Sequence, residues 1–341
     1  MELTYVAHEE IKRIRELDCS NVERTRLFAT LSRINTLYMI MQAGSGHIGS
    51  SFSAMDIVSW LYLNEMELAE DPDADGDIYF SSKGHDAPGY YSVLLGLGRL
   101  DFSLIHELRR LNGLPGHPDV EVPGVQANTG SLGMGISKAK GMVLAHRLQN
   151  KKAKVYVLTG DGELQEGQFW ESLASAVHLG MSEITVIIDH NKIQSDTWVS
   201  LVNDLGDLEA KLKAFGWYVT RCDGNDVQAV SGCLEECKKI SDRPQIIIAD
   251  TLKGQGVPFM ADTAMLDEGE LYQFHSGAPA AEDYVRACEE LIENANGQLR
   301  SLGVEELKLA HADLRPRAVV DDPQRLIVAY SRALVAQGRN N

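Results

Sequence analysis

The sequence predicts an α/β fold in which a parallel sheet is flanked by helices on both faces. Four nearly continuous apolar runs lie between residues 155 and 251, at 155–160, 184–190, 216–224 and 244–251. Stretches of helical character separate these runs. Buried strands that alternate with helices are typical of parallel sheets covered on both sides.

A helix is predicted over residues 8–43. Apolar residues recur there at helical spacing, and Gly44 follows as a stop signal. The stripe consists of Leu27, Leu31, Ile34, Leu37 and Met41. From about residue 44 to 135, we expect short helical pieces between loops rich in Gly, Pro, Ser and His.

The C-terminal part should be helical and polar over residues 281–320, with a loop at HADLRPRAVVDD. A last helix is predicted after it, because Asp322 suits its cap, Pro323 its first turn and Gly338 its end. Leu326 or Ile327, Tyr330 and Leu334 would give this helix an apolar stripe. Two interpretations remain open: a docking helix for a partner subunit, or an extra helix packed on the same domain.

The composition excludes several classes of protein. The formal net charge is −17, whereas a surface for nucleic acid or anionic membrane needs a basic field. No apolar run approaches the roughly 20 residues that span a bilayer, and the N-terminus lacks a signal peptide's apolar core. Cys233 and Cys237 lie one helical turn apart, without the second pair or nearby histidine that a zinc site needs. We therefore expect a cytoplasmic protein with reduced thiols.

Polar residues follow two consecutive predicted strands. Asp161 stands between two glycines at the end of the first, and Asn191 follows the next. Adjacent parallel strands joined by one helix would bring both side chains to the same edge of the sheet, where ligands bind. A carboxylate and an amide oxygen are hard ligands, suited to Mg²⁺ or Ca²⁺ together with phosphate oxygens. A helix beginning near Gln165 would aim N–H groups at the same anion, which Gly160 and Gly162 allow to approach closely.

Other interpretations of this motif are weaker. A lone GDG is often a plain turn. A dinucleotide turn needs a third glycine, which GDGELQ lacks, and the chain has no P-loop motif. The combination of GDG with an asparagine about thirty residues later, each after a strand, is far more specific than either feature alone.

Four histidines lie in loops rich in Gly or Pro: His47, His85, His117 and His275. Loops that share one edge of the sheet would make them suited to proton transfer near neutral pH. They lack the H-x-x-x-H spacing of a metal site. The other histidines have no such context, and we interpret them as structural or exposed.

Several segments resemble the transketolase family. GDGELQEGQFWES and DHNKIQSD are similar to its thiamine-diphosphate motif, in the form carried by N-terminal subunits of split transketolases. The resemblance runs from about residue 25 to 280. It includes SGHIGSSFSAMDI, SKGHDAPGYY, GLPGHPD, NTGSLGMG and FHSGAP, in this order.

The resemblance implies a role for each matching position. Asp161, Asn191 and the carbonyl of Ile193 would bind the metal, and Gly162 would donate its N–H to the diphosphate. His85, Gly130 and Leu132 would border the cofactor, and Glu166 would lie at a subunit interface. His275 would reach the diphosphate or the substrate, while His47 and His117 would line the substrate channel.

The resemblance also implies a partner. Transketolases move a two-carbon ketol unit from a ketose to an aldose, and a glutamate from a second, pyrimidine-binding domain activates the cofactor. We expect residues 1–280 to form the diphosphate-binding domain, with 281–341 as a C-terminal extension. The second domain would come from another subunit, in a heterotetramer, so that this chain alone would be inactive.

Two alternatives follow from the same resemblance. One is another thiamine-diphosphate enzyme, such as a 1-deoxyxylulose-5-phosphate synthase or a specialised ketolase, and the other is a non-catalytic scaffold. Two positions depart from the family pattern: Ile48 stands where proline is usual, and Trp198 where small or polar residues are usual. Each would either reshape the substrate entrance or reflect different packing.

Overall fold

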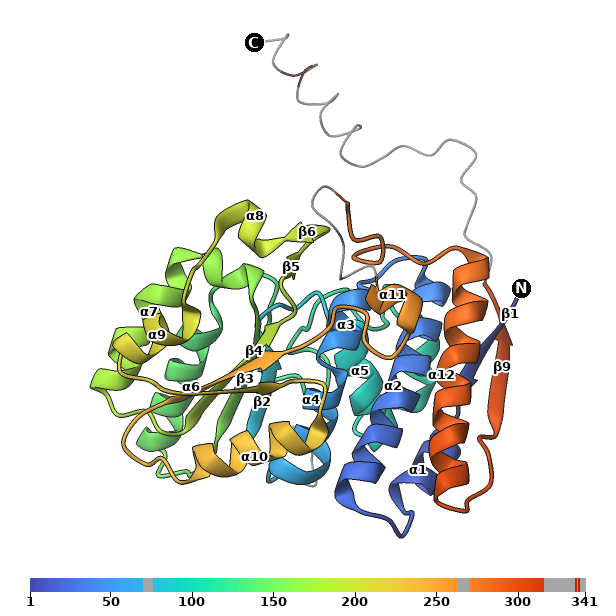
Figure 1. Cartoon of the computed structure of the whole chain (residues 1–341), viewed down its shortest axis with the longest axis horizontal. Coiled ribbons are helices and arrows are strands. Elements are labelled where there is room, and N and C mark those ends of the chain that lie inside the picture. The colour runs from blue at the N-terminus through green and yellow to red at the C-terminus, as the bar shows by residue number, and fades with distance from the viewer. Residues whose placement is uncertain (70–75, 263–269, 316–334, 336, 338–341) are drawn as a thin grey trace.

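The computed structural model describes residues 1–69, 76–262 and 270–315, together with residues 335 and 337. The predicted fold class is confirmed: a parallel sheet is flanked by helices on both faces (Figure 1). The last helix predicted, from Asp322 to Gly338, lies outside the described residues except for those two positions.

The central sheet has five parallel strands in the order β2-β3-β4-β8-β7. All strands predicted from the apolar runs are confirmed, two of them slightly shorter than expected: β3 (Val155–Gly160), β4 (Ile184–His190), β7 (Tyr218–Asp223) and β8 (Gln245–Asp250). The edge strand β2 (Ile78–Ser81) was expected to be helix or loop. Its four residues are too short a run for periodicity to distinguish strand from helix.

Alternate residues of the strands enter two separate cores. On β3, Tyr156 and Leu158 belong to one core, and Val155 and Val157 to the other. The first core is covered by α2 (Asn21–Ala43), α4 (Met55–Trp60), α5 (Ala87–Leu97), α10 (Val227–Lys238) and α12 (Ala281–Ser301). The second is covered by α6 (Gly135–Leu148), α7 (Gly167–His178) and α9 (Leu208–Ala214).

The predicted helix over residues 8–43 is interrupted. It forms α1 (His8–Arg15) and α2, because Ser20 caps a new helix. The Ser20 side chain accepts the Glu23 N–H, and the Glu23 carboxylate accepts the Ser20 N–H, a reciprocal capping box. Gly44 ends α2 as predicted, with a positive φ of 69° that glycine tolerates at no steric cost.

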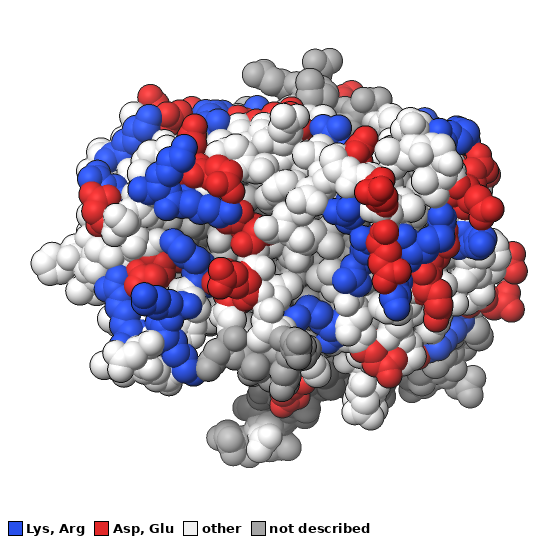
Figure 2. Space-filling model, turned by 90° about the horizontal axis from the view of Figure 1, so that it is seen from below, with Lys and Arg blue, Asp and Glu red and all other residues white. Residues whose placement is uncertain are grey.

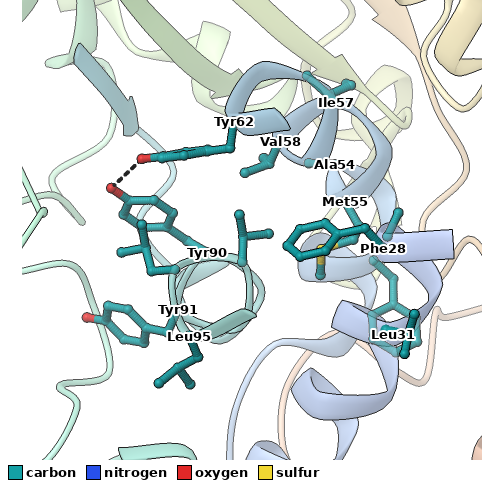
Figure 3. Packing of buried hydrophobic residues seen from close by; sticks show 14 of the residues in the cluster. Phe28, Leu31, Ala54, Met55, Ile57, Val58, Tyr62, Tyr90, Tyr91 and Leu95 are labelled. Carbon is teal, nitrogen blue, oxygen red and sulfur yellow. Dashed lines mark hydrogen bonds between the residues drawn. The ribbon is translucent and has the colours of Figure 1, made fainter. Parts of the chain in front are cut away.

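The first core holds the loops that carry the histidines. Figure 3 shows where α2 meets α4 and α5: Phe28 and Leu31 of α2 lie beside Met55 of α4, across from Tyr90 and Tyr91 of α5. The Tyr62 and Tyr90 hydroxyls share a hydrogen bond of 3.0 Å inside it. Because α3 (Ile48–Ser53) runs into α4, this packing fixes the loop around His47.

A two-stranded ribbon corrects the prediction for the C-terminal part. The helix α12 ends at Ser301, and the first residues of the expected loop instead belong to β9 (Leu309–Asp313). This strand pairs antiparallel with β1 (Glu2–Val6). The partners lie at opposite ends of the chain, so a local pattern could not reveal the pairing.

Short elements complete the described part of the chain. They are η1 (Leu61–Glu65), η2 (Phe102–His106), η3 (Gly162–Gln165), β5 (Ile193–Gln194), β6 (Thr197–Trp198), α8 (Val199–Asn203) and α11 (Pro258–Asp262).

The surface and the thiols agree with the composition. On the face seen in Figure 2, acidic and basic side chains are intermixed, without a broad basic patch. No helix in the described ranges has the length and apolar character to cross a membrane. All five cysteines are free, and Cys233 and Cys237 are both buried.

Candidate functional site

A cavity of about 290 Å³ lies at the carboxyl ends of β3 and β4. Most of the site residues predicted from the sequence line it: His47, His85, His117, Leu132, Asp161, Gly162, Asn191, Ile193 and His275. The segments that carry them are far apart in the chain. The expectation that these loops share one edge of the sheet is therefore confirmed.

Two predicted residues do not line this cavity. Gly130 stands behind His117: its φ is +122°, and a Cβ there would lie 2.9 Å from the His117 ring. Glu166 is exposed and lies beside Gly133. Its exposure does not test the role at a subunit interface, which stays a prediction.

Asp161 ties together the ends of two neighbouring strands. Its Oδ1 accepts the Gly162 N–H at 2.7 Å, and its Oδ2 accepts the N–H of Lys192, in the loop after β4. Burial, followed by the nearby Asp189 carboxylate, raises the pKa of Asp161. The Gly162 N–H that the sequence analysis assigned to a diphosphate is thus donated to Asp161 here.

The helix expected near Gln165 begins slightly later. Residues Gly162–Gln165 form the 3₁₀ turn η3, and α7 starts only at Gly167. The turn forms because Glu163 faces inward, where its carboxylate accepts the Gly160 N–H at 3.2 Å. The strand therefore does not lead directly into an α-helix.

The oxygens of Asn191 and Ile193 lie in the same loop. Asn191 Oδ1 accepts the Ile193 N–H at 3.1 Å, and the Ile193 carbonyl accepts the Lys253 Nζ at 3.1 Å. Each of these oxygens keeps a second lone pair, and the Asp161 carboxylate keeps two. Hard oxygen donors of this kind fit Mg²⁺ or Ca²⁺. No group of three or more His, Cys, Asp or Glu side chains in the described ranges is arranged to hold a metal, so a cation here would rely on amide and carbonyl oxygens.

Three of the four histidines form one cluster. The ring centroids of His47 and His85 lie 5.0 Å apart, and those of His47 and His275 also 5.0 Å. Burial lowers the pKa of His47 to about 4 and that of His275 to about 3. Burial also lowers the pKa of His85 and of His117. In the free chain these imidazoles are therefore neutral at pH 7, each with one N–H donor and one acceptor nitrogen.

Several buried polar atoms in this cavity have no hydrogen-bond partner within the part of the chain that the structure describes. They include the Nδ1 atoms of His47 and His275 and the Oε1 of Gln194. Unpaired buried polar atoms are rare, and in a cavity they indicate a ligand or ordered water. Gly162 also lies so close to Gln194 that a Cβ would come within 2.9 Å of its Cβ.

Lys253 was not among the site residues predicted from the sequence. Its side chain is only 2% exposed, yet its Nζ donates to the carbonyls of Ile193 and Ser195, at 3.1 and 2.9 Å. Burial lowers the pKa of this ammonium to about 8. Within the described residues, this buried ammonium donates its hydrogen bonds to neutral carbonyl oxygens. Its positive charge therefore suits an anionic ligand. A lysine three residues after a buried strand, followed by Gly-Gln-Gly, is the signal that was available.

Two buried carboxylates were also missed. Glu163 accepts hydrogen bonds from the Gly133 N–H at 2.8 Å, from Thr159 Oγ1 at 2.7 Å and from Ser82 Oγ. Asp189, fully buried, accepts from Lys83 Nζ at 2.7 Å. Both carboxylates join loops that line the cavity. The sequence gives little signal for such a partnership, because the partners lie far apart along the chain.

Of the two departures from the family pattern, the structure explains Trp198 by its packing. Trp198 is half-buried in β6, and it packs against the buried cluster of Ile193 and Tyr272. Ile48 is buried at the start of α3, only 1% exposed.

The similarity of this chain to known proteins agrees with this geometry. Residues 24–289 match the family described as transketolase, thiamine diphosphate binding domain. The chain is 34% identical to an apulose-4-phosphate transketolase subunit of Actinobacillus succinogenes over 280 residues, which cover 80% of this chain and 98% of the relative. It is 35% identical to a 6-deoxy-6-sulfo-D-fructose transketolase subunit of a Clostridium species over 237 residues, 68% of this chain and 86% of the relative.

Solved structures show the same fold. The transketolase from Campylobacter jejuni superimposes with a TM-score of 0.69 at 27% identity, over 84% of this chain. The matched region is 44% of that transketolase, so this chain spans less than half of its length.

The low histidine pKa values predict an acid-sensitive fold. The unfolded chain takes up protons on these rings below about pH 6.5, whereas folded His47 and His275 resist them down to pH 4 or lower. The free energy of unfolding should therefore fall as the pH drops from 6.5 toward 4. Urea denaturation across this range measures the change. The free energy of unfolding of the His275→Gln variant should depend less steeply on pH than that of the wild type. NMR titration midpoints near 6.5 for both rings would contradict this.

Proposed function

The chain belongs to the transketolase family of transferases, and we propose that it is the N-terminal, diphosphate-binding subunit of a heteromeric transketolase. In this proposal it helps to move a two-carbon ketol unit from a ketose or ketose phosphate to an aldose. The observation that carries the proposal is the cavity itself, where the Asp161 carboxylate, the Asn191 loop, Lys253 and the histidine cluster meet.

The residues of the cavity fit thiamine diphosphate and a divalent cation. Asp161, Asn191 and the Ile193 carbonyl would hold Mg²⁺ or Ca²⁺ through their spare lone pairs. Lys253 would balance the remaining negative charge of the diphosphate, which an acidic protein cannot do through its overall field. Gly162 would lie at the diphosphate as well, and His85, Gly130 and Leu132 would border the rest of the cofactor.

The histidines would handle protons at the substrate oxygens. Bound thiamine diphosphate supplies the thiazolium carbon that accepts and releases the two-carbon unit. His47 and His117 are neutral, so each can donate an N–H to a carbonyl oxygen or accept a hydroxyl proton without a change of pH. The Nδ1 of His275, which has no hydrogen-bond partner among the described residues, would offer a further polar atom to the diphosphate or the donor sugar.

A partner subunit completes this proposal. Relatives of similar length are named as transketolase subunits, and this chain spans 44% of a solved transketolase. The partner would supply the pyrimidine-binding domain with its activating glutamate, in a cytoplasmic heterotetramer. The exposed Glu166 would lie at the interface with it. Within this chain, we assign residues 1–280 to the diphosphate-binding domain and 281–341 to a C-terminal extension.

The relatives named above differ in substrate. The class of possible substrates for this chain is therefore broad. One is named for apulose 4-phosphate and the other for 6-deoxy-6-sulfo-D-fructose. Both names describe ketoses that carry a terminal anionic group. We therefore include sugars and sugar phosphates as donors and acceptors.

Asp161→Ala should abolish metal-dependent cofactor binding. Loss of the carboxylate removes one cation ligand, and we expect the affinity for thiamine diphosphate in the presence of Mg²⁺ to fall by at least about tenfold. Isothermal titration calorimetry measures this, and circular dichroism checks the fold. Asp242→Ala, at an exposed carboxylate, is the matched control. Unchanged magnesium-dependent affinity in Asp161→Ala would remove the metal assignment.

The chain alone should be catalytically silent. With thiamine diphosphate, Mg²⁺ and a ketose donor, we expect no ketol transfer, because the activating glutamate belongs to the partner. Activity should appear when the product of an adjacent gene that encodes a pyrimidine-binding domain is added. Ketol transfer by the purified chain without any partner would refute the heteromeric assignment.

A further inference from the structure

The carboxylate of Asp189 joins four segments beneath the proposed cation site. It is fully buried and lies near the end of β4. Its Oδ2 accepts from Ser53 Oγ at 2.6 Å, from Lys83 Nζ at 2.7 Å and from Asn191 Nδ2 at 3.2 Å, and its Oδ1 accepts from Thr251 Oγ1. A buried charge is costly unless it is paired and hydrogen-bonded, and this one is both.

Lys83 forms an ion pair with this carboxylate. Its side chain is 2% exposed, and its Nζ also donates to the carbonyl and the hydroxyl of Ser50, both at 3.1 Å. Asp86 lies 3.4 Å from the same ammonium. An ionised carboxylate can only accept hydrogen bonds. Every side chain that bonds to Asp189 must therefore present a donor to it.

This rule decides which way the Asn191 amide faces. An amide has a donor end and an acceptor end of nearly the same shape, and only the NH₂ end can bond to Asp189. The oxygen end is thereby forced to the opposite side, where it accepts the Ile193 N–H at 3.1 Å. A residue without an acceptor at position 189 would leave only the Ile193 N–H to hold the amide in this orientation.

We propose that Asp189 is a positioning residue, which holds the Asn191 amide with its oxygen toward the cation and so prepares the metal site before the cofactor arrives. The inference rests on the proposed function, since it concerns a ligand of the proposed metal. It adds a role for a buried residue that touches neither the metal nor the substrate. Ligands held in orientation by an outer partner bind metals more tightly, and loss of such a partner typically costs 10–100-fold in affinity.

The test uses Mn²⁺ as a paramagnetic probe on the full chain with thiamine diphosphate. Free Mn²⁺ is followed by electron paramagnetic resonance. Asp189→Ala removes the acceptor that holds the donor end of the Asn191 amide, so we expect Mn²⁺ affinity to fall at least about tenfold. Thr251→Val is the matched control: it removes a bond to Oδ1, but leaves the Oδ2 that orients Asn191, and its Mn²⁺ affinity should stay near that of the wild type.

An exchange variant separates positioning from simple stabilisation. Asp189→Ala combined with Asn191→Asp moves the carboxylate from position 189 to position 191 and so conserves charge. An oxygen of that carboxylate faces the cation whichever way the side chain turns. We expect this variant to recover Mn²⁺ binding, even if its melting temperature stays below that of the wild type.

The outcomes distinguish the inference from the function it rests on. Wild-type affinity in folded Asp189→Ala would overturn the positioning role alone. So would a folded exchange variant that binds Mn²⁺ weakly, and this variant decides the matter if the single variant fails to fold. If the wild-type chain itself binds no Mn²⁺ with thiamine diphosphate, the metal assignment falls and the inference falls with it.

Discussion

The parallel pairing of β3 with β4 is the constraint on which the site depends. Gly160 lies opposite Asp189 in this register, so Asp161 and the loop that begins at Asn191 leave the sheet side by side. The Asp161 carboxylate then accepts the Lys192 N–H and joins the two ends. A slip of one residue would turn Asp161 and Asn191 to the wrong face. The two buried cores that fix the register therefore also fix the oxygens assigned to the cation.

Individual buried cations must supply the positive charge at the site, because the net charge of the chain is −17. Lys253 and Lys83 are both buried, but they serve different ends. Lys83 is paired with Asp189, whereas Lys253 contacts the carbonyls of Ile193 and Ser195. One cation therefore supports the framework of the site, and the other remains suited to a bound anion. The histidines stay neutral because they are buried, and so add polar groups without adding charge.

The sequence predicted the sheet and most of the cavity because both depend on short-range patterns. Apolar runs marked the four longer strands, and loop motifs marked Asp161, Asn191 and the histidines. Several of the errors come from long-range contacts. The ribbon of β1 and β9 joins the two ends of the chain, and the Asp189 partners Lys83 and Thr251 come from loops on other strands. Nothing within a local window shows that Lys83 will meet Asp189.

In the proposed function, Asp161, Asn191 and the Ile193 carbonyl share one cation at the diphosphate of a bound cofactor. The sharpest test is a crystal structure of the chain grown with thiamine diphosphate and Mn²⁺, because anomalous scattering locates the metal independently of the protein coordinates. We expect a single anomalous peak between these three oxygens and the diphosphate, with Lys253 facing the phosphates. A cofactor bound without metal at these residues, or a peak at another site, would contradict it.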